Sequence, residues 1–211
     1  MSVLNEISAF LQEGDDEKVF LLTKQAIDDG IAPVDILNKG LLAGMEVVGN
    51  KFRNFEIFLP DVLMAAKAMY AGMDQLKPLL IRDGVPAMGK IVIGTVQGDL
   101  HDIGKNLVGI MLKGAGIEVI DLGKDVPAEK FIETAVREKA TVIGLSALLT
   151  TTTDAMKTVI RLLKEQGLDK SIKTIIGGAP VSEEFAREIG ADAYAADATD
   201  AVEKITGFLK E

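Results

Sequence analysis

The sequence contains no cysteine and only one histidine among its 211 residues. The absence of cysteine excludes disulfides, thiolate zinc sites, iron–sulfur clusters and a cysteine nucleophile. With a single histidine as well, the chain cannot build a soft-metal site from several side chains of its own. If that residue, His101, binds a metal, the remaining ligands must arrive with a cofactor, as a macrocycle would supply them.

The sequence also lacks a basic cluster and a long apolar run. A formal net charge of −9 argues against a nucleic-acid partner, which normally needs a clustered basic face. Charge or glycine interrupts the apolar stretches before the ~18 residues that a membrane span needs, and no charged n-region with an apolar core opens the sequence. We therefore expect a soluble, cytoplasmic protein that binds neither nucleic acid nor membrane.

The first 81 or so residues carry the pattern of helices alone. Apolar side chains recur at three- and four-residue spacing, with breaks at Gly14, Gly30 and around Asn54. We expect a bundle of four helices: a short first one, a second from Asp15–Asp16 to about Asp29, a third from Pro33 to about Arg53, and a fourth that begins at Leu59 and that Pro78 kinks or ends. The turn-rich composition of residues 82–89 indicates a linker.

From Lys90 onward the pattern changes to short β-branched runs that alternate with amphipathic helices. Strands are predicted near 90–96, 117–122, 141–146, 172–176 and 193–196. Such apolar strands imply a parallel sheet covered on both faces, and five βα units favour the flavodoxin-like order 2-1-3-4-5. The predicted class is α/β: a four-helix bundle at 1–84, a linker at 85–89 and a Rossmann-like domain with a five-stranded parallel sheet at 90–211.

The single histidine lies directly after the first predicted strand, in the run Gly98-Asp99-Leu100-His101-Asp102-Ile103-Gly104. Neutral imidazole is a common metal ligand, and a carboxylate two residues away can hold its other ring nitrogen. Asp99 and His101 therefore have the spacing of a ligand and its orienting partner. The alternative is a histidine that caps or decorates a loop, and this short motif alone does not choose between the two.

Other chemistry-bearing residues follow neighbouring strands of the predicted sheet. Ser146 and Thr150 follow the third strand, and Gly177-Gly178 follows the fourth. Ligands of open parallel sheets bind beyond the carboxyl ends of the strands, so these residues predict an elongated slot with His101 at its mouth. The alternatives are ordinary: Ser146 and Thr152 as helix caps, and the glycine pair as a tight turn.

Taken together, these motifs resemble a known family. The resemblance rests on Asp99-Leu100-His101-Asp102-Ile103-Gly104, Ser146-Ala147-Leu148, Gly177-Gly178, Val47-Val48-Gly49-Asn50-Lys51-Phe52 and Phe58-Leu59-Pro60. Over nearly its whole length the chain resembles the corrinoid (cobalamin-binding) methyl-carrier proteins of methanol and methylamine methyltransferase systems. It is also similar to the cobalamin module of cobalamin-dependent methionine synthase.

The resemblance implies a role for each matched residue. His101 would be the lower axial ligand of cobalt, in place of the cofactor's own dimethylbenzimidazole. Asp99 would accept the second imidazole proton, and Thr152 stands where methionine synthase has a serine that completes this proton relay. The nucleotide tail would lie in the slot bounded by Gly104, Ser146, Gly177 and Gly178. Further cofactor contacts are implied for Leu100, Asp102, Thr150 and Ala198.

The helical half would then be a cap over the upper, methyl-bearing face of the corrinoid, with Phe52 and Leu59 at the contact. A strongly reducing cobalt needs shielding from water and oxygen, so an apolar lid makes physical sense. The apolar group Phe52, Phe55, Phe58, Leu59 and Met64 fits a lid, but its helical spacing fits bundle core equally well. Partner access requires the cap to move, with residues 82–89 as its hinge.

The implied function is a methyl shuttle in one-carbon metabolism, with methylcobalamin as the carrier form. Its implied partners are a substrate-specific methyltransferase, an acceptor methyltransferase that uses tetrahydrofolate or a thiol, and a reductive activase. The chain would act as a component of that system, with or without catalytic activity of its own. The methyl donor stays open: methanol, methylamines, betaines and methoxylated aromatics all fit.

Three other functions are compatible with parts of the pattern. A cobalamin-dependent sensor or regulator has the same two domains, but usually carries a basic DNA-binding helical domain. The small subunit of a cobalamin mutase shares the histidine motif and lacks the helical cap. A phosphate-binding or response-regulator-like module would carry an acidic phosphoacceptor cluster or a Gly-rich lysine loop, for which Lys105 after Gly104 is a poor substitute.

Overall fold

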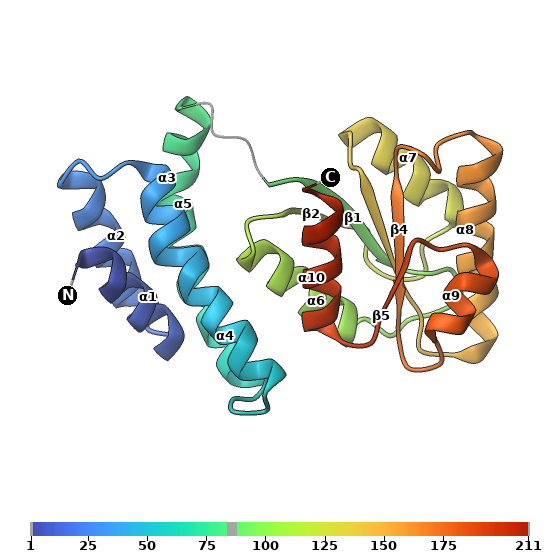
Figure 1. Cartoon of the computed structure of the whole chain (residues 1–211), viewed down its shortest axis with the longest axis horizontal. Coiled ribbons are helices and arrows are strands. Elements are labelled where there is room, and N and C mark those ends of the chain that lie inside the picture. The colour runs from blue at the N-terminus through green and yellow to red at the C-terminus, as the bar shows by residue number, and fades with distance from the viewer. Residues whose placement is uncertain (1, 84–87, 211) are drawn as a thin grey trace. The chain divides into compact units, whose positions relative to one another are not determined.

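The computed structural model describes residues 2–83 and 88–210, which fall into two compact units (Figure 1). One unit comprises Met1–Ala87 with Gly114–Gly116, and the other comprises Met88–Lys113 with Ile117–Glu211. The linker and hinge expected at 82–89 include residues 84–87, which lie outside the described residues.

The first unit is helical. Its elements are α1 (Val3–Glu13), α2 (Asp16–Asp28), α3 (Pro33–Asp35), the π-helix η1 (Ile36–Leu42), α4 (Ala43–Arg53) and α5 (Leu59–Arg82). The Asp15 carboxylate caps α2 by accepting the N–H of Lys18, and Gly30 after this helix is left-handed with φ 77°. Because α3, η1 and α4 follow one another without a break, the four expected helical segments are confirmed.

Pro78 does not end the last helix. Helix α5 continues through it to Arg82, so the expectation of a helix end at this proline is wrong. Proline removes one backbone hydrogen bond and crowds the preceding turn. Here that cost is confined to the last turns, and continuing the helix places Leu80 in the buried interior together with Leu76.

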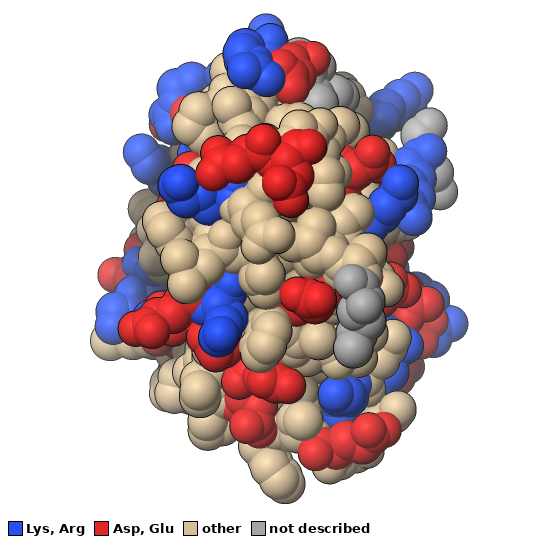
Figure 2. Space-filling model, turned by 90° about the vertical axis from the view of Figure 1, so that its left-hand side faces the viewer, with Lys and Arg blue, Asp and Glu red and all other residues tan. Residues whose placement is uncertain are grey.

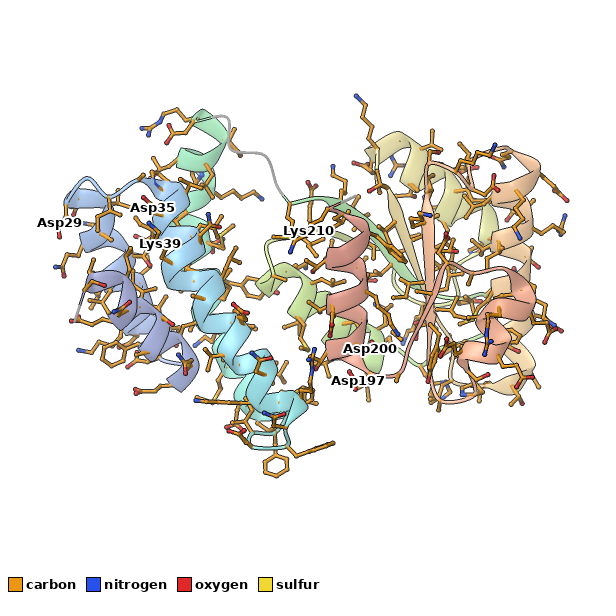
Figure 3. All side chains as sticks on the ribbon, in the orientation of Figure 1. Asp29, Asp35, Lys39, Asp197, Asp200 and Lys210 are labelled. Atoms are coloured by element: carbon orange, nitrogen blue, oxygen red, sulfur yellow. The ribbon has the colours of Figure 1, made fainter. Side chains whose placement is uncertain are left out.

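The surface of the helical unit carries both charges. Figure 2 shows acidic and basic side chains interspersed with uncharged ones on the face that it presents. One exposed ion pair joins Lys39 to Asp35 on the next turn at 2.9 Å, and Figure 3 labels both residues. None of the described helices is long and apolar enough to cross a membrane.

The second unit is a parallel α/β domain. Its strands are β1 (Lys90–Thr95), β2 (Glu118–Asp121), β3 (Val142–Ser146), β4 (Lys173–Gly177) and β5 (Ala193–Ala195). They form one sheet in the order β2-β1-β3-β4-β5, with every pairing parallel. The predicted strand order is therefore confirmed, and with it the prediction that the loops after β1 and β3 are neighbours.

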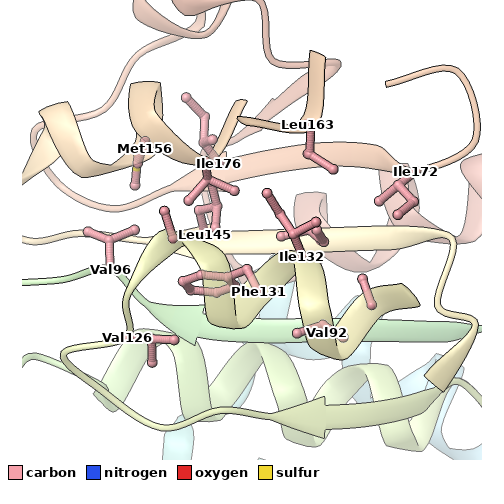
Figure 4. Close-up of a cluster of buried hydrophobic side chains, with 14 of the residues drawn as sticks. Val92, Val96, Val126, Phe131, Ile132, Leu145, Met156, Leu163, Ile172 and Ile176 are labelled. Atoms are coloured by element: carbon pink, nitrogen blue, oxygen red, sulfur yellow. The ribbon is translucent and has the colours of Figure 1, made fainter. Parts of the chain in front are cut away.

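Helices cover both faces of this sheet. They are α6 (Ile103–Gly114), α7 (Ala128–Glu138), α8 (Thr153–Glu165), α9 (Glu183–Ile189) and α10 (Ala198–Phe208), with a 3-10 turn η2 (Thr150–Thr152) before α8. Figure 1 shows α7, α8 and α9 on one face and α6 with α10 on the other. The main core lies under α7 and α8, where Val92, Phe131, Leu145 and Met156 pack together (Figure 4).

The two faces of β1 serve different purposes because strand side chains alternate. Val92 points into the core beneath α7. Ile91 and Ile93 face the opposite side, beneath α6 and α10, where they line a cavity instead of a filled core. The sheet thus has one packed face and one hollow face, and the hollow one opens toward the carboxyl ends of the strands.

Candidate functional site

His101 lies in the loop between β1 and α6, with half of its side chain exposed. Its Nδ1 is 2.8 Å from Oδ1 of Asp99, and the backbone N–H of His101 donates to the same oxygen at 3.0 Å. The Thr95 hydroxyl donates to the His101 carbonyl at 3.0 Å. The ring is therefore oriented by one nitrogen while the other, Nε2, carries no bond from the described residues.

Asp99 is fully buried, and both of its oxygens accept hydrogen bonds. Oδ2 accepts the backbone N–H groups of Leu148 and Leu149 at 2.7 and 3.1 Å and the Thr152 hydroxyl at 2.8 Å. Burial by itself raises the pKa of this carboxyl. The hydrogen bonds from backbone N–H groups, the imidazole and the hydroxyl outweigh burial and hold its pKa well below the ordinary value.

The ionised carboxylate fixes the tautomer of the neutral imidazole. A carboxylate can only accept, so the proton between Asp99 and His101 belongs to Nδ1. Nε2 then keeps its lone pair and faces outward, which is the arrangement of a metal-ligating histidine with its orienting carboxylate. This geometry favours the ligand interpretation of His101 over a histidine that only decorates a loop.

Thr152 occupies the N-cap position of α8, yet its hydroxyl does not cap that helix. It lies 2.8 Å from the Asp99 carboxylate and 2.8 Å from the Leu149 carbonyl. Ser146 likewise caps nothing, since it is the last residue of β3, paired with Thr95 and Gly177. The helix-cap alternatives therefore fail for both hydroxyls.

A cavity of about 370 Å³ opens on the hollow face of the sheet, between α6 and α10. Most of its wall is apolar, from β1, β3, β4 and the two helices. The lining includes Ile91, Ile93, Gly104, Lys105, Val108, Gly144, Ser146, Ile175, Gly177, Gly178, Tyr194, Asp197, Ala201 and Ile205. All four residues predicted to bound the slot, namely Gly104, Ser146, Gly177 and Gly178, lie in this wall.

Two glycines of the cavity wall contribute to the site in different ways. A Cβ at Gly104 would meet no atom within 4 Å, so the absence of a side chain there leaves open space at the start of α6. Gly178 has φ 127° and a Cβ there would lie 1.8 Å from the Ala147 carbonyl oxygen, so no other residue fits this backbone. The pair Gly177-Gly178 is thus both a turn and a close approach of two loops.

Four other predicted residues of the α/β unit do not line the cavity. Leu100 is exposed and Asp102 is half-buried beside His101, while Thr150 is exposed in η2. Ala198 is buried in the first turn of α10, next to Asp197, whose carboxylate caps that helix. Figure 3 shows Asp197 and Asp200 at this end of α10.

The apolar group of the helical unit separates into two kinds of residue. Phe55 and Phe58 are 86% and 70% exposed, and Met64 is exposed as well, so these three are not bundle core. Phe52 and Leu59 are half-buried. The turn between α4 and α5 turns Phe55 outward with a left-handed backbone at φ 58°, which periodicity could not predict.

Sequence reasoning missed the loop after β2 and the ion pair beside it. Lys105 is buried in the cavity wall, and its Nζ lies 2.6 Å from both oxygens of Asp121 and 2.7 Å from Oδ1 of Asn106. Asp125 accepts the N–H of Gly98 at 2.7 Å. The sequence signal for the ion pair is an acid at the end of β2 together with a lysine at the start of α6.

The residues near His101 suit a flat apolar group held by one metal bond. Leu100 and Ile103 are close to His101 in the chain, Leu148 and Leu149 are bonded to Asp99, and all four expose apolar side chains. Within residues 2–83 and 88–210 no cluster of three or more histidine, aspartate or glutamate side chains could hold a metal by itself. A metal at His101 thus fits only with ligands from a cofactor.

Comparisons with known proteins agree with this site. Residues 89–206 match a family model described as a B12 binding domain, and residues 3–77 match a second model with the same description. A corrinoid protein of Desulfitobacterium hafniense is 47% identical over 99% of this chain and 98% of its own length. The chain belongs to the corrinoid proteins. Its cofactor is cobalamin or a related corrinoid, and its helical unit is the cap domain of that family.

Two further relatives connect this corrinoid protein with methyl transfer. Dimethylamine corrinoid protein 1 of Methanosarcina acetivorans is 51% identical over 84% of each chain. In the crystal structure of the methanol:cobalamin methyltransferase complex from Methanosarcina barkeri, one chain is 33% identical with a TM-score of 0.89. That match covers 99% of this chain and 80% of the other. The predicted family, fold class, cofactor and methyl-carrier function are thereby confirmed.

The bond from Thr152 to Asp99 should stabilise the protein even without a corrinoid. We expect Thr152→Val to lower the free energy of unfolding by about 2 kcal/mol, because a buried carboxylate loses a charge-assisted hydrogen bond. Thr152→Ser keeps the hydroxyl and should retain most of that stability. Urea unfolding measures both, with Thr150→Val as the control on the same 3-10 turn. Equal stability of the valine and serine variants would contradict the assignment.

Proposed function

We propose that this corrinoid protein carries methyl groups between two methyltransferases, with His101 as the lower ligand of the cobalt ion. The observation that carries the proposal is an imidazole whose Nδ1 is fixed by a buried carboxylate and whose Nε2 has no hydrogen-bond partner in the part of the chain that the structure describes. When bound, the corrinoid supplies the chemistry, since its cobalt accepts the methyl group and releases it again. The chain would bind the corrinoid, orient it and enclose it.

The α/β unit would hold the lower side of the cofactor. His101 would bind the metal, and the exposed apolar side chains of Leu100, Ile103 and Leu148 would support the flat macrocycle. The cavity between α6 and α10 would take the nucleotide tail. Its apolar walls suit an aromatic base, and Ser146 lies on the cavity side of β3, since its neighbour Leu145 points into the packed core.

Asp99 and Thr152 would control the proton on the imidazole. The carboxylate keeps a proton at Nδ1, and this makes Nε2 a better donor of electrons to a metal. Thr152 and two backbone N–H groups hold the carboxylate in place as it orients the imidazole. We assign supporting cofactor contacts to Asp102, which follows His101 in the chain, and to Thr150, which is in the same 3-10 turn as Thr152. A further supporting contact is assigned to Ala198, because it follows Asp197 of the cavity wall.

The helical unit would shield the upper side of the cofactor. Phe52 and Leu59 are the residues proposed to cover it, and the exposed Phe55 and Phe58 lie on the same turn between α4 and α5. Exclusion of water protects a strongly reducing metal centre. The exposed apolar side chains of Phe55 and Phe58 support the proposal of such a lid.

We propose a substrate-specific methyltransferase, an acceptor methyltransferase and a reductive activase as partners. The methanol:cobalamin methyltransferase complex from Methanosarcina barkeri supports the first of these, since one chain of that complex resembles this one. The relative named for dimethylamine is 51% identical, whereas the chain in the methanol complex is 33% identical. This difference favours a methylated amine over methanol as the donor.

Removal of the proposed metal ligand tests the function directly. His101→Ala should bind hydroxocobalamin at least about tenfold more weakly, and the bound corrinoid should lack the absorption and electron paramagnetic resonance (EPR) signature of a histidine ligand. Since His101 is the only histidine, no other imidazole can replace it. A wild-type spectrum from the variant would exclude the assignment.

The cavity is tested separately by filling it. Gly104→Leu places a side chain in the open space at the start of α6, so binding of cobalamin should weaken about tenfold or more. Cobinamide, which lacks the nucleotide tail, should bind as it does to the wild type. Gly207→Leu is the matched control, because this glycine is also helical with open space around it and lies outside the cavity wall. Equal weakening of both corrinoids would contradict a tail-binding slot.

A further inference from the structure

The loop that follows β2 is bonded to the end of β1 and to the segment that carries His101. We call residues 122–127 the β2–α7 loop and residues 96–102 the histidine loop. Backbone hydrogen bonds run from Leu122 N–H to the Ile93 carbonyl, from Thr95 N–H to the Gly123 carbonyl and from Val126 N–H to the Thr95 carbonyl, at 2.8 to 3.0 Å. An isolated parallel bridge joins Val96 to Val126. The β2–α7 loop thus continues the pairing of β1 beyond the end of the strand.

Asp125 extends this contact to the residues next to the proposed ligand. Its side chain accepts the N–H of Gly98 at 2.7 Å, and its own N–H donates to the carbonyl of Asp99 at 3.0 Å. One residue therefore holds the backbone of the histidine loop at two points, the N–H of Gly98 and the carbonyl of Asp99. Asp99 is bonded in turn to His101 through both the ring and the backbone N–H.

The backbone of Asp125 is held in a costly conformation. It has φ 55°, in the left-handed region that residues other than glycine rarely adopt, although aspartate and asparagine tolerate it best. Such a conformation persists only where the surroundings impose it, and it clusters at functional sites. Here the two bonds to Gly98 and Asp99 are the interactions that the left-handed turn makes possible.

The side chain and the backbone of Asp99 are held by two different loops. The carboxylate is held by the loop after β3, through Leu148, Leu149 and Thr152. The backbone on either side of its amide is held by Asp125 from the β2–α7 loop. Loss of the second support would leave the carboxylate anchored while the peptide that leads to the imidazole is free to shift.

We propose that Asp125 is a positioning residue that aims His101 by holding the peptide groups of Gly98 and Asp99. The inference rests on the proposed function, in which His101 ligates the corrinoid. Asp125 is not among the residues that line the cavity, and its hydrogen bonds to Gly98 and Asp99 are the route by which it acts on His101.

Three substitutions at one position separate the parts of this role. Asp125→Asn keeps an acceptor oxygen and tolerates the left-handed backbone, so it should bind hydroxocobalamin like the wild type. Asp125→Gly relieves the backbone but removes the acceptor, and its Kd should rise about tenfold. Asp125→Ala loses the acceptor and strains the backbone, so its Kd should rise further. Lys139→Gly is the control, since Lys139 is also left-handed at φ 56° and ends α7.

A second readout distinguishes positioning from simple destabilisation. At saturating corrinoid, EPR of the Co(II) form should show a smaller histidine-ligated share in Asp125→Gly than in the wild type and Asp125→Asn. In the protein without corrinoid, the Gly98 amide should exchange its hydrogen faster in Asp125→Gly than in the wild type or in Asp125→Asn. Destabilisation alone would lower the melting temperature without changing the fraction of bound corrinoid that shows the histidine-ligated signal.

The outcomes separate this inference from the function on which it rests. If His101→Ala loses the histidine signature while Asp125→Gly keeps the wild-type Kd and ligated share, the positioning role is wrong and the function stands. Equal losses in the asparagine and glycine variants would also overturn the role, because the acceptor oxygen would then be irrelevant. If His101→Ala keeps the signature, both proposals fall.

Discussion

The buried carboxylate of Asp99 is the interaction on which the arrangement of the site depends. An ionised group in the interior is costly unless hydrogen bonds replace the water that it has lost. Its Oδ1 is satisfied by His101, and its Oδ2 is satisfied by two N–H groups and a hydroxyl of the loop after β3. One charge therefore draws the loops after β1 and β3 together and orients the imidazole between them.

The strand order makes this possible. Since β1 and β3 are adjacent in the order β2-β1-β3-β4-β5, their carboxyl ends deliver Asp99 and Thr152 to the same place. The same order places β2 on the side of β1 opposite to β3, so the β2–α7 loop can bond to the histidine loop. The cavity on the hollow face reaches Gly104, three residues after His101 in the chain. The glycines and small residues of β3 and β4 leave space there that the larger residues of the packed face do not.

Much of this could be predicted from the sequence, because the signals are local. β-branched runs predict the strands, and the alternation of strands and helices predicts the parallel sheet with its order. The two-residue spacing of Asp99 and His101 predicts an oriented imidazole. The hydroxyl at Thr152 and the glycines at 104, 177 and 178 were identified by their place after strands and by resemblance, and the structure brings them to one edge of the sheet.

The features that escaped prediction depend on tertiary contacts. Asp125 becomes visible only when the β2–α7 loop lies beside the histidine loop, and the Lys105–Asp121 pair becomes visible only when the start of α6 lies beside the end of β2. Helical spacing could not decide whether the phenylalanines near the α4–α5 turn face inward, since the left-handed Phe55 breaks the periodicity there. Pro78 could not be placed either, because burial of Leu80 beyond it favours continuing the helix.

The most direct test of the central claim is the tautomer of His101 in the protein without corrinoid, measured from its two ring-nitrogen chemical shifts by NMR. The chain has one histidine, so the signals need no assignment. At a pH where the imidazole is neutral, the structure predicts a proton on Nδ1, shared with Asp99, and an unprotonated Nε2. A proton found on Nε2 instead would contradict the claim that Asp99 prepares this histidine as a ligand.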